Sequence, residues 1–350
     1  MYNIRCIWRL LCKSNILPLK LYRGYCAQPA TEKKLNILFF GTDNFSLPSL
    51  MLLDKSREWP NSKINHLDVI TTFKGFNVNP VLKYAKNNNL KCMDWTVFKN
   101  DNNRMKYDLG VVVSFGHLIP ENLINQFLFG MVNVHPSLLP RWRGSAPIIH
   151  AILHEDDVTG VSIMAIRPHK FDAGEIFLQE KFPIPKLVLM SELFEALSNE
   201  GAKLLAKFIH GLPNSMSLAR KQGNQNVTYA PRISDSMPVI NWKTMSSRYI
   251  CNLFRALYSF KWLQTHWHGR KITITEIDIT ETSLGSMLVD HRPPGHVEYD
   301  KKHKYLRVHC IDGQCIRIKR LKIEGKRVMT ASEFYCGYIS KVNSCDRFFD

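Results

Sequence analysis

Apolar segments and amphipathic segments alternate along the first two thirds of the chain. Leu35 to Phe40 is apolar on both faces and ends in a glycine turn, which is typical of a buried parallel strand. The stretch after it has apolar residues on one face at helical spacing. The two patterns repeat, which predicts strands at 35–40, 67–72, 108–114, 131–135, 161–166 and 175–182 and helices at 45–53, 81–86, 120–127, 146–154 and 190–209.

Repeated strand–helix units predict an α/β fold with a doubly wound, mostly parallel, Rossmann-like sheet. The turn after the first strand reads Gly41-Thr42-Asp43-Asn44-Phe45-Ser46. It lacks the Gly-x-Gly-x-x-Gly pattern that holds a dinucleotide pyrophosphate. The sequence therefore does not support binding of a nicotinamide dinucleotide.

The last third of the chain has a different pattern of short alternating segments. A helix is predicted at 248–258, followed by strands at 271–279, 305–310 and 315–323. Asp312-Gly313 between two of these strands indicates a hairpin. The pattern predicts a small C-terminal OB-like β-barrel domain. We therefore expect four segments, namely an N-terminal segment at 1–33, an α/β domain at 34–210, a polar linker at 211–230 and the barrel domain at 231–350.

Charge favours a polyanionic partner, because the formal net charge is +17 and the isoelectric point is about 9.5. The predicted barrel domain has 20 Lys and Arg residues against 12 Asp and Glu residues, a net charge of +8. Strand alternation places Arg317 and Lys319 on the face opposite Ile316 and Ile318. That face is either a ridge that contacts phosphates or an ordinary solvated strand face.

The first 31 residues contain five basic residues and no acidic one, and the first acidic residue is Glu32. The basic residues are interleaved with apolar ones, which is typical of a mitochondrial transit peptide rather than of a secretory signal. A disordered basic tail is the alternative. The sequence has no apolar run of about eighteen residues, so we expect no membrane span.

Neither cysteines nor histidines predict a metal site. The nine cysteines form no Cys-x-x-Cys pair and are expected to be reduced thiols. His150 and His154 are one helical turn apart, but the segment is not His-Glu-x-x-His. We therefore expect no bound metal.

Candidate chemistry is concentrated at the end of the strand that begins at Met131. Asn133 and His135 are two residues apart, so both side chains leave one face of that strand. Asp172, followed by Ala173-Gly174, could supply a carboxylate to the imidazole. An amide donor, an imidazole and a carboxylate suit acyl transfer without a covalent intermediate. Turn formation or burial in the core remains possible for each residue, and Ser137 as nucleophile lacks a Gly-x-Ser-x-Gly elbow.

The stretch from Asn133 to Gly144, Asn-Val-His-Pro-Ser-Leu-Leu-Pro-Arg-Trp-Arg-Gly, strongly resembles the signature of the folate-dependent formyltransferases. The similarity extends from Leu35 to about the end of the chain. It includes Gly41-Thr42, the segment 112–116 and Thr228-Tyr229-Ala230. Arg141-Trp142-Arg143 and Ala146-Pro147 are more particular to the members that act on tRNA.

This resemblance implies that the formyl group of 10-formyltetrahydrofolate is transferred to the α-amino group of initiator methionyl-tRNA in the mitochondrial matrix. Asn133 and His135 would stabilise the tetrahedral intermediate, and Asp172 would orient His135 and raise its pKa. The folate site would be lined by Ser137, Leu138, Leu139 and Pro140. We expect the enzyme to be a monomer and to need no metal.

One departure from the family changes the expected tRNA contacts. Bacterial members have a longer Gly- and Arg-rich insertion after the second strand, where this chain has only residues 72–77. Recognition is then expected to rest on the basic C-terminal domain, with Arg317 and Lys319, and on Lys74, Arg141 and Arg143. Two alternatives remain, namely a formyltransferase or formyl hydrolase that acts on a small molecule, and a catalytically inactive RNA-binding relative.

Overall fold

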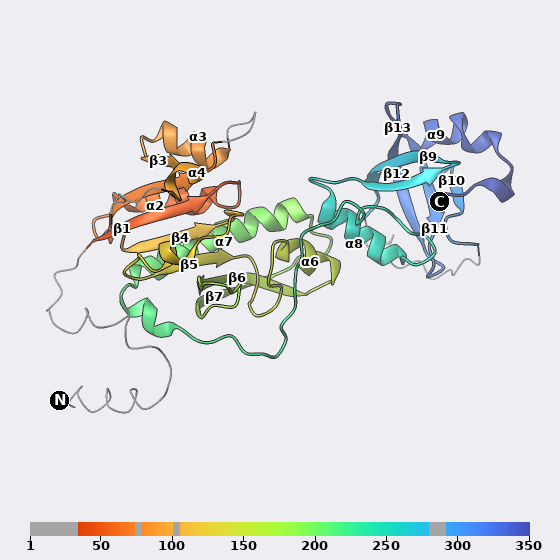
Figure 1. Cartoon of the computed structure of the whole chain (residues 1–350). Coiled ribbons are helices and arrows are strands. Elements are labelled where there is room, and N and C mark those ends of the chain that lie inside the picture. The colour runs from red at the N-terminus through yellow and green to blue at the C-terminus, as the bar shows by residue number, and fades with distance from the viewer. Residues whose placement is uncertain (1–33, 74–78, 101–105, 280–291) are drawn as a thin grey trace.

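The protein has an N-terminal α/β domain and a C-terminal domain built on an antiparallel sheet (Figure 1). The structure is a computed structural model that describes residues 34–73, 79–100, 106–279 and 292–350. The predicted transit peptide at 1–33 and Lys74 lie outside these residues. Within the described part of the chain, no helix combines the length and the apolarity needed to cross a bilayer.

The N-terminal sheet has the strand order β3-β2-β1-β4-β5-β6-β7. Neighbouring strands from β3 to β5 are parallel, whereas β6 is antiparallel to both β5 and β7. The prediction of a doubly wound, mostly parallel sheet is confirmed. The strands are β1 (Leu35–Gly41), β2 (Ile64–Thr71), β3 (Cys92–Asp94), β4 (Leu109–Val113), β5 (Met131–His135), β6 (Val158–Ala165) and β7 (Ile176–Pro183).

Helices cover both faces of this sheet because its central strands are apolar on both sides. In β1, Ile37 and Phe39 pack into one core cluster, while Leu38 and Phe40 pack into another. Side chains of α2, α3, α6 and α7 join the first cluster, and side chains of α4 and α5 join the second. The helices are α2 (Leu47–Ser56), α3 (Pro80–Asn87), α4 (Trp95–Phe98), α5 (Glu121–Ile124), α6 (Pro147–Leu153) and α7 (Met190–His210).

The long helix α7 packs closely against β5, the strand on which the candidate residues lie. Gly201 of α7 faces Val134, and a Cβ at Gly201 would come within 2.9 Å of Cγ1 of Val134. Val134 points toward α7, so its neighbours Asn133 and His135 point toward the opposite face. Packing on one face of β5 thus fixes the direction of the polar residues on the other.

The C-terminal domain combines α8 (Ser247–Leu257) with a sheet of six described strands. Their order is β10-β11-β12-β9-β8, and β13 pairs with β12. The remaining elements are β8 (Leu263–Trp267), β9 (Arg270–Ile277), β10 (Val297–Asp300), β11 (Tyr305–His309), β12 (Cys315–Ile323), β13 (Val328–Thr330), α9 (Ala331–Gly337) and the 3-10 helices η2 (Asn214–Leu218), η4 (Ile339–Lys341) and η5 (Ser344–Asp346).

The edge strands β10 and β8 are bridged by the C-terminal residues 347–350. Val297 donates its backbone N–H to the carbonyl of Arg347 (2.8 Å), and Asp350 donates to the carbonyl of His266 (3.0 Å). In the described residues this sheet therefore combines six strands with an irregular closing segment, where the sequence predicted an OB-like β-barrel. The closing segment is too short and irregular to give a strand pattern in the sequence.

Polar contacts join the two domains. Glu155, which follows α6, accepts hydrogen bonds from Nε of Arg248 (2.5 Å) and Nδ2 of Asn252 (2.6 Å), both on α8. Arg255 of α8 donates to the carbonyl of Val188 (3.2 Å). The segment predicted as a linker, 211–230, also contacts the N-terminal domain, because Ile176 and Arg220 exchange backbone hydrogen bonds of 2.9 Å.

Candidate active site

The end of β5 brings Asn133 and His135 to the wall of a cavity of about 600 Å³. β5 lies between β4 and β6, so hydrogen bonds on both sides fix its backbone. His135 is 4% exposed and Asn133 is partly buried. Among the described residues, no hydrogen bond engages the side-chain amide of Asn133. Its N–H groups are therefore available to a ligand in the cavity.

Protein groups contact both nitrogens of the His135 ring. Nε2 lies 2.9 Å from the carbonyl oxygen of Trp142, which can only accept, so the proton is on Nε2. Nδ1 lies 3.7 Å from Oδ1 of Asp172. That distance is too long for a hydrogen bond and short enough for a charge–charge attraction when Nδ1 is protonated. The structure thus brings the predicted carboxylate to the predicted imidazole.

Asp172 is held in place by the loop that follows β5. Its Oδ2 accepts a hydrogen bond of 2.8 Å from the backbone N–H of Gly144. Gly144 has φ of +123°, and a Cβ there would lie 2.5 Å from the carbonyl oxygen of Ala230, so only glycine fits. The carbonyl of Asp172 accepts from Nε2 of Gln222 (2.9 Å). Both ends of this residue are therefore anchored.

The cavity wall is mostly apolar and comes from several loops at the carboxyl ends of the strands. Crevices in this position are where open α/β sheets bind ligands. Phe171, next to Asp172, lines the cavity and is 73% exposed. The lining consists of residues 112 and 114–119 from β4 and its loop, 124, 133–136, 144–149, 164, 166–167, 169–172, Asp43, Phe45, Met190 and Phe194.

Asp43 and Ser114 form a second polar contact in the wall, between the ends of β1 and β4. Oγ of Ser114 donates to Oδ2 of Asp43 (2.5 Å), and Thr42 donates to the carbonyl of Ser114 (2.9 Å). The other carboxylate oxygen of Asp43 accepts from the backbone N–H groups of Phe45 and Ser46 (3.0 and 3.1 Å). These bonds fix the turn after β1 at the point where the strand order reverses.

The structure does not bring Ser137, Leu138, Leu139 and Pro140 to the cavity, since none of them lies in its wall. Ser162 of β6 donates to the carbonyl of Ser137 (2.6 Å) and accepts from the N–H of Leu139 (3.2 Å). Leu139 is 3% exposed in a core cluster. These contacts anchor the loop on β6. The loop that was predicted to line the folate site therefore holds the backbone beside the cavity in place.

Arg141 forms an ion pair with Asp156, although its side chain is partly exposed. Its Nε and one terminal nitrogen donate to the two carboxylate oxygens of Asp156, at 2.7 and 2.5 Å. This hydrogen bonding raises the pKa of Arg141 above its ordinary range. The indole N–H of Trp142 also donates to Asp156 (2.7 Å). Asp156 thus holds the loop whose carbonyl positions His135.

The other residues predicted to bind tRNA lie in two different domains. Arg143 donates to Oε1 of Gln222 at 3.1 and 2.7 Å, and neither residue lies in the cavity wall. Arg317 and Lys319 lie on β12 in the other domain, and both face Asp278. Lys74 is outside the described residues. Among the described residues of this set, Arg143 belongs to the N-terminal domain, and Arg317 and Lys319 belong to the C-terminal domain.

Two residues of the site, Asp156 and Gln222, were missed by the sequence interpretation. Asp156 lies after α6, and Gln222 lies in the segment predicted as a linker. Neither has a neighbouring pattern that would signal a role. The backbone of Thr228 and Ala230, noted for its resemblance to the family, pairs with Arg143 at 2.9 and 2.7 Å. That resemblance was the one available signal that this segment belongs to the site.

Comparison with known families gives two matches. The family described as formyl transferase matches residues 77–209, and the formyl transferase C-terminal domain matches residues 232–339. The mitochondrial methionyl-tRNA formyltransferase of Homo sapiens is 41% identical over 314 residues, covering 87% of this chain and 77% of the human protein. The methionyl-tRNA formyltransferase of Fusobacterium nucleatum is 31% identical over 323 residues, covering 88% and 98%.

Solved structures show the same fold at low sequence identity. An N-formyltransferase from Helicobacter canadensis, in complex with folinic acid and dTDP-3-aminofucose, aligns with a TM-score of 0.61 at 22% identity. The alignment covers 81% of this chain and 98% of that chain. HypX from Aquifex aeolicus in complex with tetrahydrofolic acid aligns with a TM-score of 0.55 at 13% identity, covering 89% and 48%.

Proposed function

The chain belongs to the formyl transferase family, and on this premise we propose that it transfers the formyl group of 10-formyltetrahydrofolate to the α-amino group of methionyl-tRNA. The similarity to mitochondrial and bacterial methionyl-tRNA formyltransferases over most of the chain carries this proposal. The meeting of Asn133, His135 and Asp172 at one cavity supports it.

The folate co-substrate is proposed to bind in the cavity itself. A volume of about 600 Å³ suits a ligand of this size, and the apolar wall suits a flat ring. Val112, Phe115 and Ile119 supply apolar surface at the end of β4, opposite the polar end of β5. The Ser137–Pro140 loop then acts indirectly, because its anchorage on β6 fixes the backbone between His135 and Trp142.

The residues of the site divide the chemistry between them. The amine of the aminoacyl group attacks the formyl carbon, and the carbonyl oxygen becomes an oxyanion that accepts from the Asn133 amide. The carbonyl of Trp142 keeps a proton on Nε2 of His135, so Nδ1 is the ring atom that exchanges protons. Nδ1 takes the proton from the attacking amine, Asp172 stabilises the resulting cation, and the proton passes to the departing N10 of the folate.

Methionyl-tRNA is proposed to contact both domains. Its aminoacyl end must enter the cavity, while its phosphates suit the C-terminal domain, which has a net charge of +8. Arg141 and Arg143 contribute by shaping the loop, since Asp156 and Gln222 hold their guanidinium groups.

The direct test is incubation of the purified chain with 10-formyltetrahydrofolate and methionyl-tRNA. Mass spectrometry of the esterified amino acid should detect formyl-methionine. Parallel reactions contain a dTDP-amino sugar, or no acceptor, to detect the small-molecule transferase and the formyl hydrolase. Formyl transfer to the sugar, or release of formate, with no formylated tRNA would refute the proposal.

We also propose that the enzyme works as a monomer in the mitochondrial matrix, after removal of the basic N-terminal segment. The close relatives are mitochondrial, and residues 1–31 contain no acidic residue. Protein isolated from mitochondria should begin between Ala27 and Lys34 and should have the mass of one chain by light scattering. A protein that retains Met1 in a cytosolic pool would contradict the targeting proposal, and a dimeric mass would contradict the monomer.

A further inference from the structure

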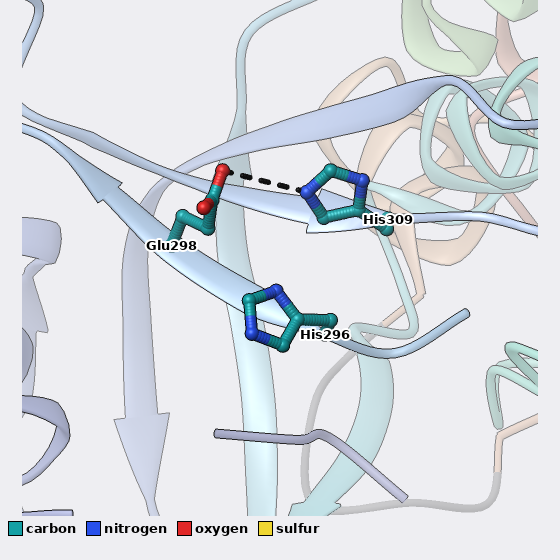
Figure 2. Close-up of side chains that lie close together, drawn as sticks. All are labelled: His296, Glu298 and His309. Carbon is teal, nitrogen blue, oxygen red and sulfur yellow. Dashed lines mark ion pairs between the residues drawn. The ribbon is translucent and has the colours of Figure 1, made fainter. Parts of the chain in front are cut away.

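Two histidines and one glutamate meet on one face of the C-terminal sheet (Figure 2). Val297 of β10 pairs with Val308 of β11, and His309 donates its N–H to the carbonyl of His296 (3.0 Å). Cross-strand partners share a face, as do residues two apart on a strand. His296, Glu298 and His309 therefore project to the same side, opposite the apolar face of Val297 and Val308.

The three side chains are spaced for a metal ion. Each offers one ligand atom, and these atoms lie within 4.8 Å of one another. Nε2 of His309 is 3.5 Å from Oε2 of Glu298 (Figure 2). Ligands about 2.0–2.1 Å from a tetrahedral Zn²⁺ are separated by roughly 3.3 Å. The separation of the His309 and Glu298 atoms is thus almost the tetrahedral one. The distances from these atoms to the His296 nitrogen would have to shorten by about 1.5 Å at most on binding of the ion.

His296 has the hydrogen-bonding pattern of a metal ligand. Its Nε2 lies 3.2 Å from the carbonyl oxygen of Ser344, so Nε2 holds the proton and Nδ1 has the lone pair. Nδ1 is buried and has no hydrogen-bond partner among the described residues. A cation at Nδ1 would satisfy a buried acceptor that is otherwise costly.

Outer contacts also orient the other two side chains. Nδ1 of His309 lies 3.3 Å from Sγ of Cys315, which leaves Nε2 directed at Glu298. Arg292 forms an ion pair with Oε1 of Glu298, so Oε2 is the oxygen that faces the histidines. Metal-binding carboxylates commonly have such a partner on the second oxygen. The positive charge of Arg292 lowers the affinity for a cation without removing the ligand.

We propose that Nδ1 of His296, Oε2 of Glu298 and Nε2 of His309 bind one Zn²⁺ ion, with water as the fourth ligand. Two imidazoles and one carboxylate suit Zn²⁺, whereas Mg²⁺ and Ca²⁺ prefer oxygen ligands alone. The ion links β10 to β11 and, through the Ser344 contact, to the C-terminal segment that closes the sheet. Its role is structural and is independent of formyl transfer.

The test uses the full chain, freed of metal with a chelator and then dialysed against ZnCl₂. Elemental analysis should find one Zn²⁺ per chain, and Zn²⁺ but not Mg²⁺ should raise the melting temperature. His296→Gln keeps a donor for the Ser344 carbonyl and removes the ligand nitrogen. It should weaken Zn²⁺ binding roughly 100-fold and abolish the thermal shift. His266→Gln, at an exposed histidine of β8, should bind like the unmodified chain.

Glu298→Gln is the second variant, because it preserves side-chain shape and does not disturb the fully buried His309. It should also lose Zn²⁺ while remaining folded. Equal Zn²⁺ binding by the unmodified chain and both variants would overturn the proposal, as would the absence of bound Zn²⁺ at micromolar concentrations. A thermal shift with inorganic phosphate that is lost in His296→Gln would show an anion site in place of a metal site.

Discussion

The side chains of Asn133 and His135 leave the same face of β5, but among the described residues protein contacts hold only the His135 ring. Both ring nitrogens of His135 face protein atoms, whereas the Asn133 amide faces the cavity. A donor with no competing partner costs little to redirect toward a developing oxyanion. Asn133 is therefore the residue whose removal should affect the chemical step with least effect on structure.

Asn133→Ala should lower kcat by roughly 10²- to 10³-fold, the usual loss for one oxyanion donor, with KM nearly unchanged. Steady-state kinetics with varied methionyl-tRNA measures both constants. Asn199→Ala, on the exposed surface of α7, is the control and should retain full activity. A near-normal kcat for Asn133→Ala would exclude the amide from the mechanism.

Asp172→Asn separates the charge of Asp172 from its hydrogen bonding. The amide oxygen can still accept from the N–H of Gly144, but it no longer stabilises a cation on His135. We expect kcat to fall by roughly 10²- to 10⁴-fold while the melting temperature changes little. Asp172→Ala, which also removes the acceptor for Gly144, should lose stability as well. Equal activity of Asp172→Asn and the unmodified enzyme would show that Asp172 only shapes the loop.

The helices and strands that the sequence predicted are those with a clear hydrophobic pattern within their own residues. β1 and β4 were found because strands buried on both faces are continuously apolar, and α7 because it has one broad apolar face. The sequence did not predict β3, β8, β10 and β13. Three of them, β3, β10 and β13, have only three or four residues and are too short to show alternation. The closure of the second sheet depends on residues 347–350, whose contacts lie far away in the sequence.

The same distinction applies to the site. Asn133 and His135 were predictable because alternation on one strand fixes their common direction. The position of the Ser137–Pro140 loop could not be predicted from the sequence. It depends on hydrogen bonds to Ser162 of β6, which lies more than twenty residues further along the chain. The His296–Glu298–His309 cluster was missed for a similar reason, since its two halves meet through the register of β10 and β11.

Glu155 links α6 to α8, and its charge should stabilise the contact between the domains. Burial opposes its ionisation, but hydrogen bonds from Asn252 and Arg248 outweigh this effect and hold the pKa of Glu155 below its ordinary value. Glu155→Gln should lower the free energy of unfolding by about 1 kcal/mol at pH 7, a value reduced because the side chain is partly exposed. Urea denaturation measures this difference.

The pH dependence of that difference gives a second check. A carboxyl group whose pKa is depressed in the folded state stabilises the protein at pH values above its ordinary pKa of 4.5. This contribution is lost as the pH falls through the folded pKa. The difference between the unmodified chain and Glu155→Gln should therefore begin to shrink near pH 4.5 and should vanish at pH values below the folded pKa of Glu155. Glu195→Gln, at an exposed residue of α7, should match the unmodified chain throughout. A constant difference at all pH values would mean that the charge is not responsible.

In the proposed function, the N-terminal domain carries out formyl transfer and the C-terminal domain provides most of the affinity for tRNA. The contacts of Glu155 with α8 join the two domains, and the segment 211–230 is held on the N-terminal domain. A charged surface on the C-terminal domain can then orient a long polyanion while its aminoacyl end reaches the cavity. The strength of this effect should appear in the salt dependence of binding.

Replacing Arg317 and Lys319 together by Ala should flatten the dependence of log affinity for tRNA on log salt concentration by about one to two units. One carboxylate, Asp278, lies 3.6 Å from Arg317 and 3.2 Å from Lys319, so the pair has a net charge near +1 and the lower figure is expected. Asp278→Asn should conversely steepen the slope. Fluorescence anisotropy with labelled tRNA at several salt concentrations measures it, and Lys203→Ala on α7 is the control. An unchanged slope in the double variant would show that this strand face is only solvated and that other cations of the domain bind the phosphates.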